Sequence, residues 1–170
     1  MTQSTETTSA TIWLSKGAFE KLTAELEYLK GPRRQEILAE ISSARDEGDL
    51  KENGGYHAAR EEQGKLEGQI QQLEALLRKA DTTVPEDDGV VSVGKLVTFK
   101  FEGDDDDEAE TRLIASIEMK DYAGGVEISS AASPIGAALI GASVGDTVTY
   151  EGPRGPLKVE ILKTEVFTGK

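Results

Sequence analysis

The chain has 170 residues and no cysteine, which excludes disulfide bonds, thiolate metal sites and a cysteine nucleophile and agrees with a reducing cytoplasm. No apolar run approaches the roughly 20 residues that a membrane span needs, so we expect a soluble protein without a membrane partner. The formal charge of −13 argues against a protein that coats duplex nucleic acid by itself, because such binding neutralises phosphates with Lys and Arg.

The N-terminal region predicts a polar tail followed by a long, interrupted helix. Residues 1–12 are rich in Thr and Ser and lack the basic and apolar parts of a signal peptide, so we expect a frayed tail. Ser15 is a suitable N-cap, and Gly31-Pro32 predicts a kink or short break. Apolar residues at helical spacing lie on both sides of that break: Phe19, Leu22, Leu26 and Leu29, then Ile37, Leu38, Ile41 and Ala44.

A second helix follows a polar, Gly-rich segment from Asp46 to Gly55. Its apolar positions alternate spacings of three and four, as in a coiled-coil seam: Tyr56, Ala59, Gln63, Leu66, Ile70, Leu73 and Leu77. Two helices with matching stripes and a short connection pack as an antiparallel hairpin. At 1.5 Å per residue, a helix from Asn53 to Ala80 would span about 40 Å, long enough to carry the tip into a narrow channel.

The C-terminal half shows the period-two alternation of half-buried strands, at Val97 to Phe101, Val148 to Tyr150 and Leu157 to Ile161. Ser133-Pro134, with Gly141 after the apolar residues, predicts a short capped helix. The acidic run 104–108 lacks the ligand spacing of a calcium loop and predicts a solvated hairpin turn.

The predicted fold class is therefore α+β, an antiparallel helical hairpin followed by a mostly antiparallel β domain with one short helix. We divide the chain into a tail (1–12), a coiled-coil arm with an acidic tip (13–82), a linker (83–94) and a C-terminal domain (95–170).

Two separated motifs resemble the signatures of one known family. The first is Gly48-Asp49-Leu50-Lys51-Glu52-Asn53, followed by Tyr56-His57-Ala58-Ala59-Arg60-Glu61. The second is Ser133-Pro134-Ile135-Gly136 with Leu139-Ile140-Gly141, then Val144-Gly145-Asp146. They are similar to the arm-tip and C-terminal signatures of the GreA/GreB family of transcription elongation factors, and the resemblance covers the chain from about Trp13 onward.

The resemblance implies a monomer with a coiled-coil arm and an FKBP-like C-terminal domain. That domain would dock on the rim of the RNA polymerase secondary channel, and Ser133, Pro134 and Ile135 match the docking segment. The arm would reach the catalytic centre, where the active site of the polymerase cuts backtracked RNA. The protein would then be no enzyme itself, and its partners would be RNA polymerase and the 3′ end of the nascent RNA.

The resemblance assigns catalysis to Asp49 and Glu52, as ligands of a Mg²⁺ ion that the polymerase shares. Mg²⁺ prefers oxygen ligands and keeps several waters, so two carboxylates can complete a site but do not hold the ion tightly alone. Divalent ions commonly assist phosphodiester hydrolysis. The alternative is that both residues merely oppose the macrodipole of the second helix.

Arg45, Lys51 and Arg60 match the basic patch of the family, which implies a guide for the RNA 3′ end. The alternative is surface ion pairs with Asp46, Glu47 or Glu61. For Tyr56 we expect plain packing and for His57 an exposed bystander. Gly54-Gly55 stands where the family often has Ala-Glu, so we expect a more flexible loop.

Two other functions stay open. A binding-only regulator would occupy the same channel without stimulating cleavage. A prolyl isomerase would follow from the fold of the C-terminal half alone, a weak basis because one fold hosts many functions.

Overall fold

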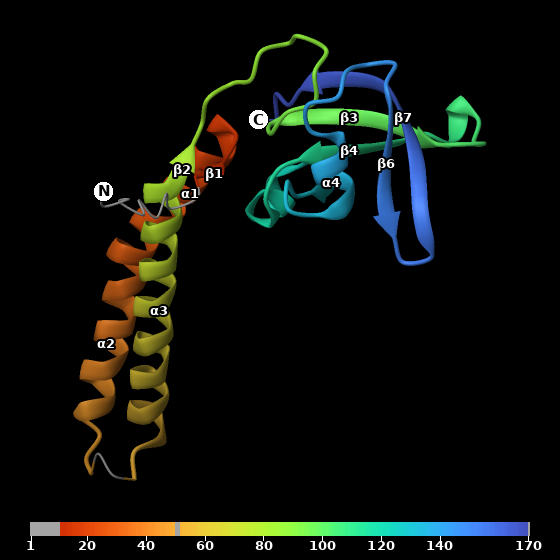
Figure 1. Cartoon of the computed structure of the whole chain (residues 1–170). Helices are drawn as coiled ribbons and strands as arrows, with labels where there is room; N and C mark the ends of the chain where they lie inside the picture. Colours follow the sequence, from red (N-terminus) through yellow and green to blue (C-terminus); the bar gives the residue numbers. More distant parts are fainter. Residues whose placement is uncertain (1–10, 50–51, 170) are drawn as a thin grey trace, which may run out of the picture. The chain divides into compact units, whose positions relative to one another are not determined.

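The computed structural model describes residues 11–49 and 52–169 (Figure 1). They form two compact units, Glu20–Lys79 and the rest of the described chain. The first unit is a helical hairpin and the second is a mostly antiparallel sheet with a short helix, so the predicted α+β class is confirmed. Within the described part of the chain, no helix is both long enough and apolar enough to cross a membrane.

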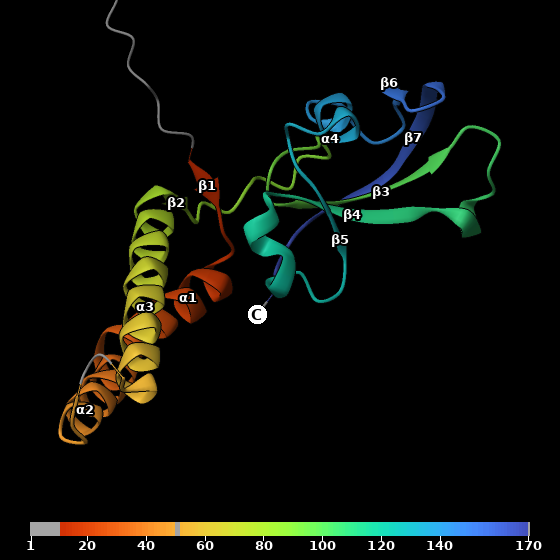
Figure 2. The same cartoon turned by 90° about the horizontal axis from the view of Figure 1, so that it is seen from below.

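Three helices build the hairpin: α1 (Lys16–Tyr28), α2 (Arg34–Arg45) and α3 (Gly54–Lys79). The Oγ atom of Ser15 accepts a hydrogen bond from the backbone N–H of Ala18 at 3.1 Å, which confirms Ser15 as the N-cap of α1. Figures 1 and 2 show α2 and α3 side by side along their length. The predicted antiparallel hairpin is therefore present.

The segment Leu29–Arg33 between α1 and α2 is a π-helical turn. Pro32 has no N–H, and its ring would clash with the carbonyl of Tyr28 in a regular α-helix. The wider π-turn accommodates the ring, and Tyr28 and Arg34 on either side keep right-handed helical dihedral angles. The predicted kink or short break is thus a local widening within a continuous helical path.

The hairpin core lies where the two apolar stripes meet. Its buried members are Ile37, Ile41, Ala59, Leu66 and Ile70. Leu38 was predicted to share this stripe, but 48% of it is exposed. Adjacent residues on a helix point about 100° apart, so the face that buries Ile37 turns Leu38 outward. Tyr56 packs against the core, as expected.

Ion pairs flank this core on the hairpin surface. Nε and Nη2 of Arg34 each donate to one carboxylate oxygen of Glu67 at 2.9 Å. Lys30 pairs with Glu74 at 3.2 Å. Such partly exposed pairs each contribute about 1 kcal/mol or less, so apolar packing carries most of the stability of the arm.

The second unit contains a five-stranded sheet in the order β5-β4-β3-β7-β6. All neighbouring strands are antiparallel except β4 and β5, which are parallel. The three predicted strands are confirmed as β3, β6 and β7. The strands are β3 (Lys95–Phe101), β4 (Glu110–Ile114), β5 (Glu127–Ser129), β6 (Thr147–Gly152) and β7 (Gly155–Val166).

Helix α4 (Pro134–Leu139) closes the core of this unit against the sheet. Two 3-10 turns, Asp106–Glu108 and Ile117–Tyr122, complete it. The first lies in the connection from β3 to β4, so the acidic run is a hairpin turn, as predicted. The buried core consists of Val91, Val97, Phe99, Ile114, Ile135, Leu139, Val159 and Ile161. Val91 falls inside the range 83–94 that the sequence suggested as a linker.

A small parallel sheet joins β1 (Ile12–Trp13) to β2 (Ala80–Asp81) in the second unit. The Trp13 indole donates to the carbonyl of Thr83 at 2.9 Å, and its ring meets Phe167 edge to face at 6.4 Å. Gly94 has φ +94°, and a Cβ there would lie 2.9 Å from the indole. Residues 11–19 therefore group with the sheet domain, whereas the sequence assigned 13–82 to the arm.

Candidate functional site

The backbone at the tip of the hairpin turns between the end of α2 and the start of α3. Arg45 is the last residue of α2, and the N–H of Glu47 donates back to the carbonyl of Ala44 at 3.2 Å. Gly48 has φ +125°, a conformation that residues with a Cβ rarely adopt, so the glycine lets the chain reverse here. The N–H of Glu52 then donates to the carbonyl of Asp49 at 3.3 Å.

Asn53 caps α3. Its Oδ1 atom accepts from the backbone N–H of Tyr56 at 3.1 Å, as an N-cap side chain does. Its Nδ2 atom donates to the carbonyl of Ala44 in the last turn of α2. One side chain therefore ties the two helix ends together at the base of the turn.

Asp49 and Glu52 are both exposed in this turn. The first turn of α3 contains no acidic residue, and Asn53 is its cap. Opposition to the helix dipole acts mainly within the first turn, so that role does not account for Asp49, which lies five residues before Gly54. What the two residues share is exposure at the far end of the hairpin.

Of the three predicted basic residues, Arg45 and Arg60 are exposed beside the turn, and Lys51 lies outside the described residues. The Arg45 guanidinium lies 5.8 Å from the centre of the Tyr56 ring, which fixes it by a cation–π contact. Arg60 donates to Gln63 at 3.0 Å. In residues 11–49 and 52–169, neither arginine forms an ion pair with Asp46, Glu47 or Glu61.

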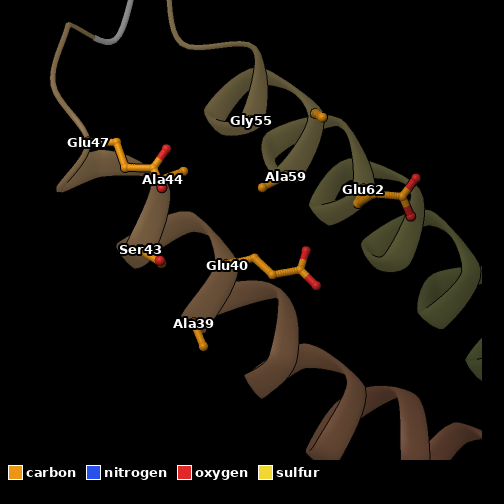
Figure 3. Close-up of a pocket in the computed structure, with 9 residues that line it drawn as sticks. Ala39, Glu40, Ser43, Ala44, Glu47, Gly55, Ala59 and Glu62 are labelled. Carbon is orange, nitrogen blue, oxygen red and sulfur yellow. The ribbon is translucent and has the colours of Figure 1, made fainter.

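A groove of about 540 Å³ runs along the hairpin next to the turn. Figure 3 shows the residues that line it, with Glu40 reaching from α2 towards α3. Small side chains leave this space open, and three glutamates give it negative charge: the lining residues are Ala39, Glu40, Ser43, Ala44, Glu47, Gly55, Ala58, Ala59 and Glu62. None of them is basic, so the groove disfavours phosphate.

The predicted docking segment begins α4 in the second unit. Ser133 Oγ accepts from the N–H of Gly136 at 3.1 Å and donates to the carbonyl of Ser130 at 2.7 Å, which confirms the capped helix. Pro134 is exposed, but Ile135 is only 7% exposed and belongs to the core. Ile135 therefore packs beneath the segment, and the exposed Pro134 and the partly exposed Ser133 present its surface.

Sequence reasoning placed Asn53-Gly54-Gly55 in the polar connection and also counted the second helix from Asn53, and it missed the role of the Asn53 side chain. The available signal was an Asn directly before a helical apolar pattern, a common N-cap arrangement. The hydrogen bond to Ala44 had no such signal, because it joins residues nine positions apart through the fold of the hairpin.

Comparison with known proteins identifies the class of this chain as a transcription elongation factor. Residues 12–81 match the family described as transcription elongation factor, N-terminal, and residues 86–165 match the family described as transcription elongation factor, GreA/GreB, C-terminal. The two matches cover both units. The chain belongs to the GreA/GreB family of transcription elongation factors.

Individual relatives agree over nearly the whole chain. The chain is 49% identical to the transcription elongation factor GreA of Streptomyces coelicolor, over 97% of this chain and 99% of the relative. It is 44% identical to GreA of Mycolicibacterium smegmatis, over 92% and 96%. Among solved structures, Gfh1 of Thermus aquaticus aligns at 26% identity over 92% of this chain and 99% of that chain, with a TM-score of 0.41.

Proposed function

We propose that this protein enters the secondary channel of RNA polymerase and stimulates cleavage of backtracked nascent RNA by the active site of the polymerase itself. The observation that carries the proposal is a pair of exposed carboxylates, Asp49 and Glu52, in one turn at the end of a two-helix hairpin. Membership in a family of transcription elongation factors supports the choice of partner.

The hairpin suits delivery of a side chain into a confined space. Helix α3 has 26 residues, which at 1.5 Å per residue makes it about 39 Å long. Its core is one seam of apolar contacts between two helices, so the arm is narrow along this length. A long and narrow arm can pass through a channel that a globular domain cannot enter.

The donor set at the tip fits a shared Mg²⁺ ion. Carboxylate oxygens are the ligands that Mg²⁺ prefers, and two carboxylates leave most of its six positions to other groups. Within the described ranges, no three Asp, Glu, His or Cys side chains are grouped so as to hold a metal. A bound Mg²⁺ would activate water and stabilise the leaving oxygen. Asp49 and Glu52 would supply ligands, and the polymerase the rest.

The charged groups around the tip give the RNA a preferred path. Arg45 and Arg60 are exposed cations that can hold phosphates by charge-assisted hydrogen bonds. The neighbouring groove carries Glu40, Glu47 and Glu62 and repels phosphates. We therefore expect the displaced RNA 3′ end to follow the arginines, while Ser133 and Pro134 of the second unit contact the channel rim.

The test uses purified polymerase held in a backtracked complex with labelled RNA. Wild-type protein should release a short 3′ fragment, and the double variant Asp49→Ala with Glu52→Ala should release none above background. Asp46→Ala with Glu61→Ala is the matched control, because it removes two exposed carboxylates beside the tip and should keep cleavage. The reason is that only a correctly placed ligand, not negative charge in general, completes a metal site.

Two results would contradict the proposal. One is a wild-type protein that binds the backtracked complex without raising fragment release. If it also blocks an added cleavage factor, the protein is a binding-only regulator of the channel. The other is equal loss in both double variants, which would reduce the role of the tip to bulk charge.

A further inference from the structure

Asn53 makes more contacts than an N-cap requires. A cap needs only a side-chain acceptor for a free N–H of the first helical turn, and Oδ1 provides it for Tyr56 at 3.1 Å. The Nδ2 donor points the other way and binds the carbonyl of Ala44 in α2. This second bond adds nothing to the cap of α3. Its effect is to join the start of α3 to the end of α2.

The Ala44 carbonyl is the point where three segments meet. It accepts from Asn53 Nδ2 at the start of α3 and from the backbone N–H of Glu47 at the start of the connection. A second contact joins the same two helix ends: the Arg45 guanidinium of α2 lies 5.8 Å from the centre of the Tyr56 ring of α3. The ends of the two helices are thus fixed to each other directly beneath the acidic turn.

The two carboxylates of the proposed function, Asp49 and Glu52, lie in the turn between Ala44 and Asn53. Glu52 directly precedes Asn53, and its N–H binds the carbonyl of Asp49. Gly54 and Gly55, which follow, bring no side chains to support the turn. We propose that Asn53 is a positioning residue, whose bond to Ala44 sets the direction in which Asp49 and Glu52 project. This inference rests on the proposed function of that pair.

Substitution can separate the cap from the bridge. Ser and Asp cap helices about as well as Asn, because each offers an oxygen acceptor. The Ser hydroxyl is too short to span to Ala44 while it caps, and the Asp carboxylate has no donor. Asn53→Ser and Asn53→Asp therefore keep α3 capped and lose the bridge, and only the second adds charge.

The experiment measures RNA cleavage in backtracked complexes over a range of factor concentrations. Both variants should lower the maximal cleavage rate by roughly 10- to 100-fold, because a displacement of about 1 Å in a reacting group costs that much. The factor concentration that gives half the maximal rate should stay near the wild-type value, and far-ultraviolet circular dichroism should show unchanged helix content. A merely structural role would move those two readouts instead.

Hydrogen exchange at the backbone amides of Glu47 and Glu52, on the protein alone, gives a readout that does not depend on the polymerase. Exchange at both should quicken in both variants, since the bridge no longer closes the turn. Wild-type rates of cleavage and exchange in Asn53→Ser would overturn the proposal, as would a defect confined to Asn53→Asp. If the wild type itself fails to stimulate cleavage, the proposed function fails, and the exchange rates then decide whether Asn53 fixes the turn.

Discussion

Helices α3 and α4 begin with the same local chemistry in different surroundings. At α3, Asn53 accepts from the N–H of Tyr56 and donates to the carbonyl of Ala44. At α4, Ser133 accepts from the N–H of Gly136 and donates to the carbonyl of Ser130. In both places one polar side chain caps a helix and also binds the chain that leads up to it.

The difference lies in what surrounds the glycines of the first turn. A Cβ on Gly136 would lie 1.9 Å from the carbonyl oxygen of Ser130, whereas a Cβ on Gly54 would meet nothing within 4 Å. Close packing therefore requires a glycine at position 136 of α4. At Gly54 the surroundings leave room for a side chain. We infer that a larger residue lowers stability at Gly136 of α4, whereas the first turn of α3 has room for one at Gly54.

Gly136→Ala should give the largest loss of stability. The new methyl group cannot fit beside the Ser130 carbonyl, and overpacking of this kind costs about 1–3 kcal/mol or more. Chemical denaturation followed by the fluorescence of Trp13, which contacts Phe167 in the same unit, measures the change. Ala137→Ser, at an exposed position of α4, is the control and should cost less than about 0.5 kcal/mol. Equal values for the two variants would contradict the packing argument.

Ser133→Ala should give the next largest effect. It removes the cap of α4 and the bond to Ser130, and loss of such a cap costs about 1 kcal/mol. The same denaturation measurement applies. Ser133→Thr keeps the hydroxyl and should retain most of the stability, so a Thr variant as weak as the Ala variant would argue against the cap.

Gly54→Ala should act in the opposite direction to Gly136→Ala. The first helical turn has room for the methyl group, and Ala is favoured over Gly in a helix by about 0.5–1 kcal/mol. Thermal unfolding followed by far-ultraviolet circular dichroism, which reports mainly on the helical arm, should show a higher midpoint. Gly55→Ala should behave alike, since its Cβ would meet only Asn53 Oδ1, at 3.4 Å. A lower midpoint would mean that the tip needs its glycines.

The smallest effect concerns a charge contact of the second unit. The hydrogen bond from the buried Lys95, followed by the N–H of Val90, lowers the pKa of Asp88 below its usual value of 3.8. A lowered pKa in the folded state stabilises the fold at pH values above the usual pKa, and this contribution is lost as pH falls through the lowered value. Asp88 is half exposed, and an Asn in its place still offers Lys95 an oxygen acceptor, so the expected change is small.

Asp88→Asn tests this contact. The variant should unfold more easily than wild type at neutral pH, and the difference should shrink as pH falls below 3.8. Denaturation midpoints by Trp13 fluorescence at a series of pH values measure it. Asp87→Asn, an exposed neighbour, is the control and should follow the wild-type curve. A difference between Asp88→Asn and wild type that grows towards acid would reverse the assigned sign.

Periodicity predicted the fold where elements are long and pack along one face. The seam of α3 and the strands β3, β6 and β7 repeat their apolar residues often enough to reveal their period. Strands β4 and β5 were not predicted, because five and three residues carry too few repeats and β5 pairs with β4 across an intervening turn. Pairing between distant residues has no local signature.

The candidate site also has features that the sequence predicted and features that only the structure revealed. The acidic pair, the basic patch and the Ser133 segment were found through motifs, and their functional roles remain proposals. Local geometry adds two details: Ile135 belongs to the core, and α3 begins at Gly54, one residue after Asn53. Neither could be read from the motif, because burial and helix boundaries depend on neighbours brought in by the fold.

The sequence by itself determined the two helices of the arm, the polar turn between them, both helix caps at Ser15 and Ser133, and the α+β class, because each rests on contacts between residues close in the chain. Only the tertiary structure decided that Asn53 joins α2 to α3, that Gly136 leaves no room for a methyl group, and that Trp13 packs on Phe167. These contacts depend on which distant segments meet when apolar surfaces are buried. The spacing of residues along the chain does not predict which segments meet.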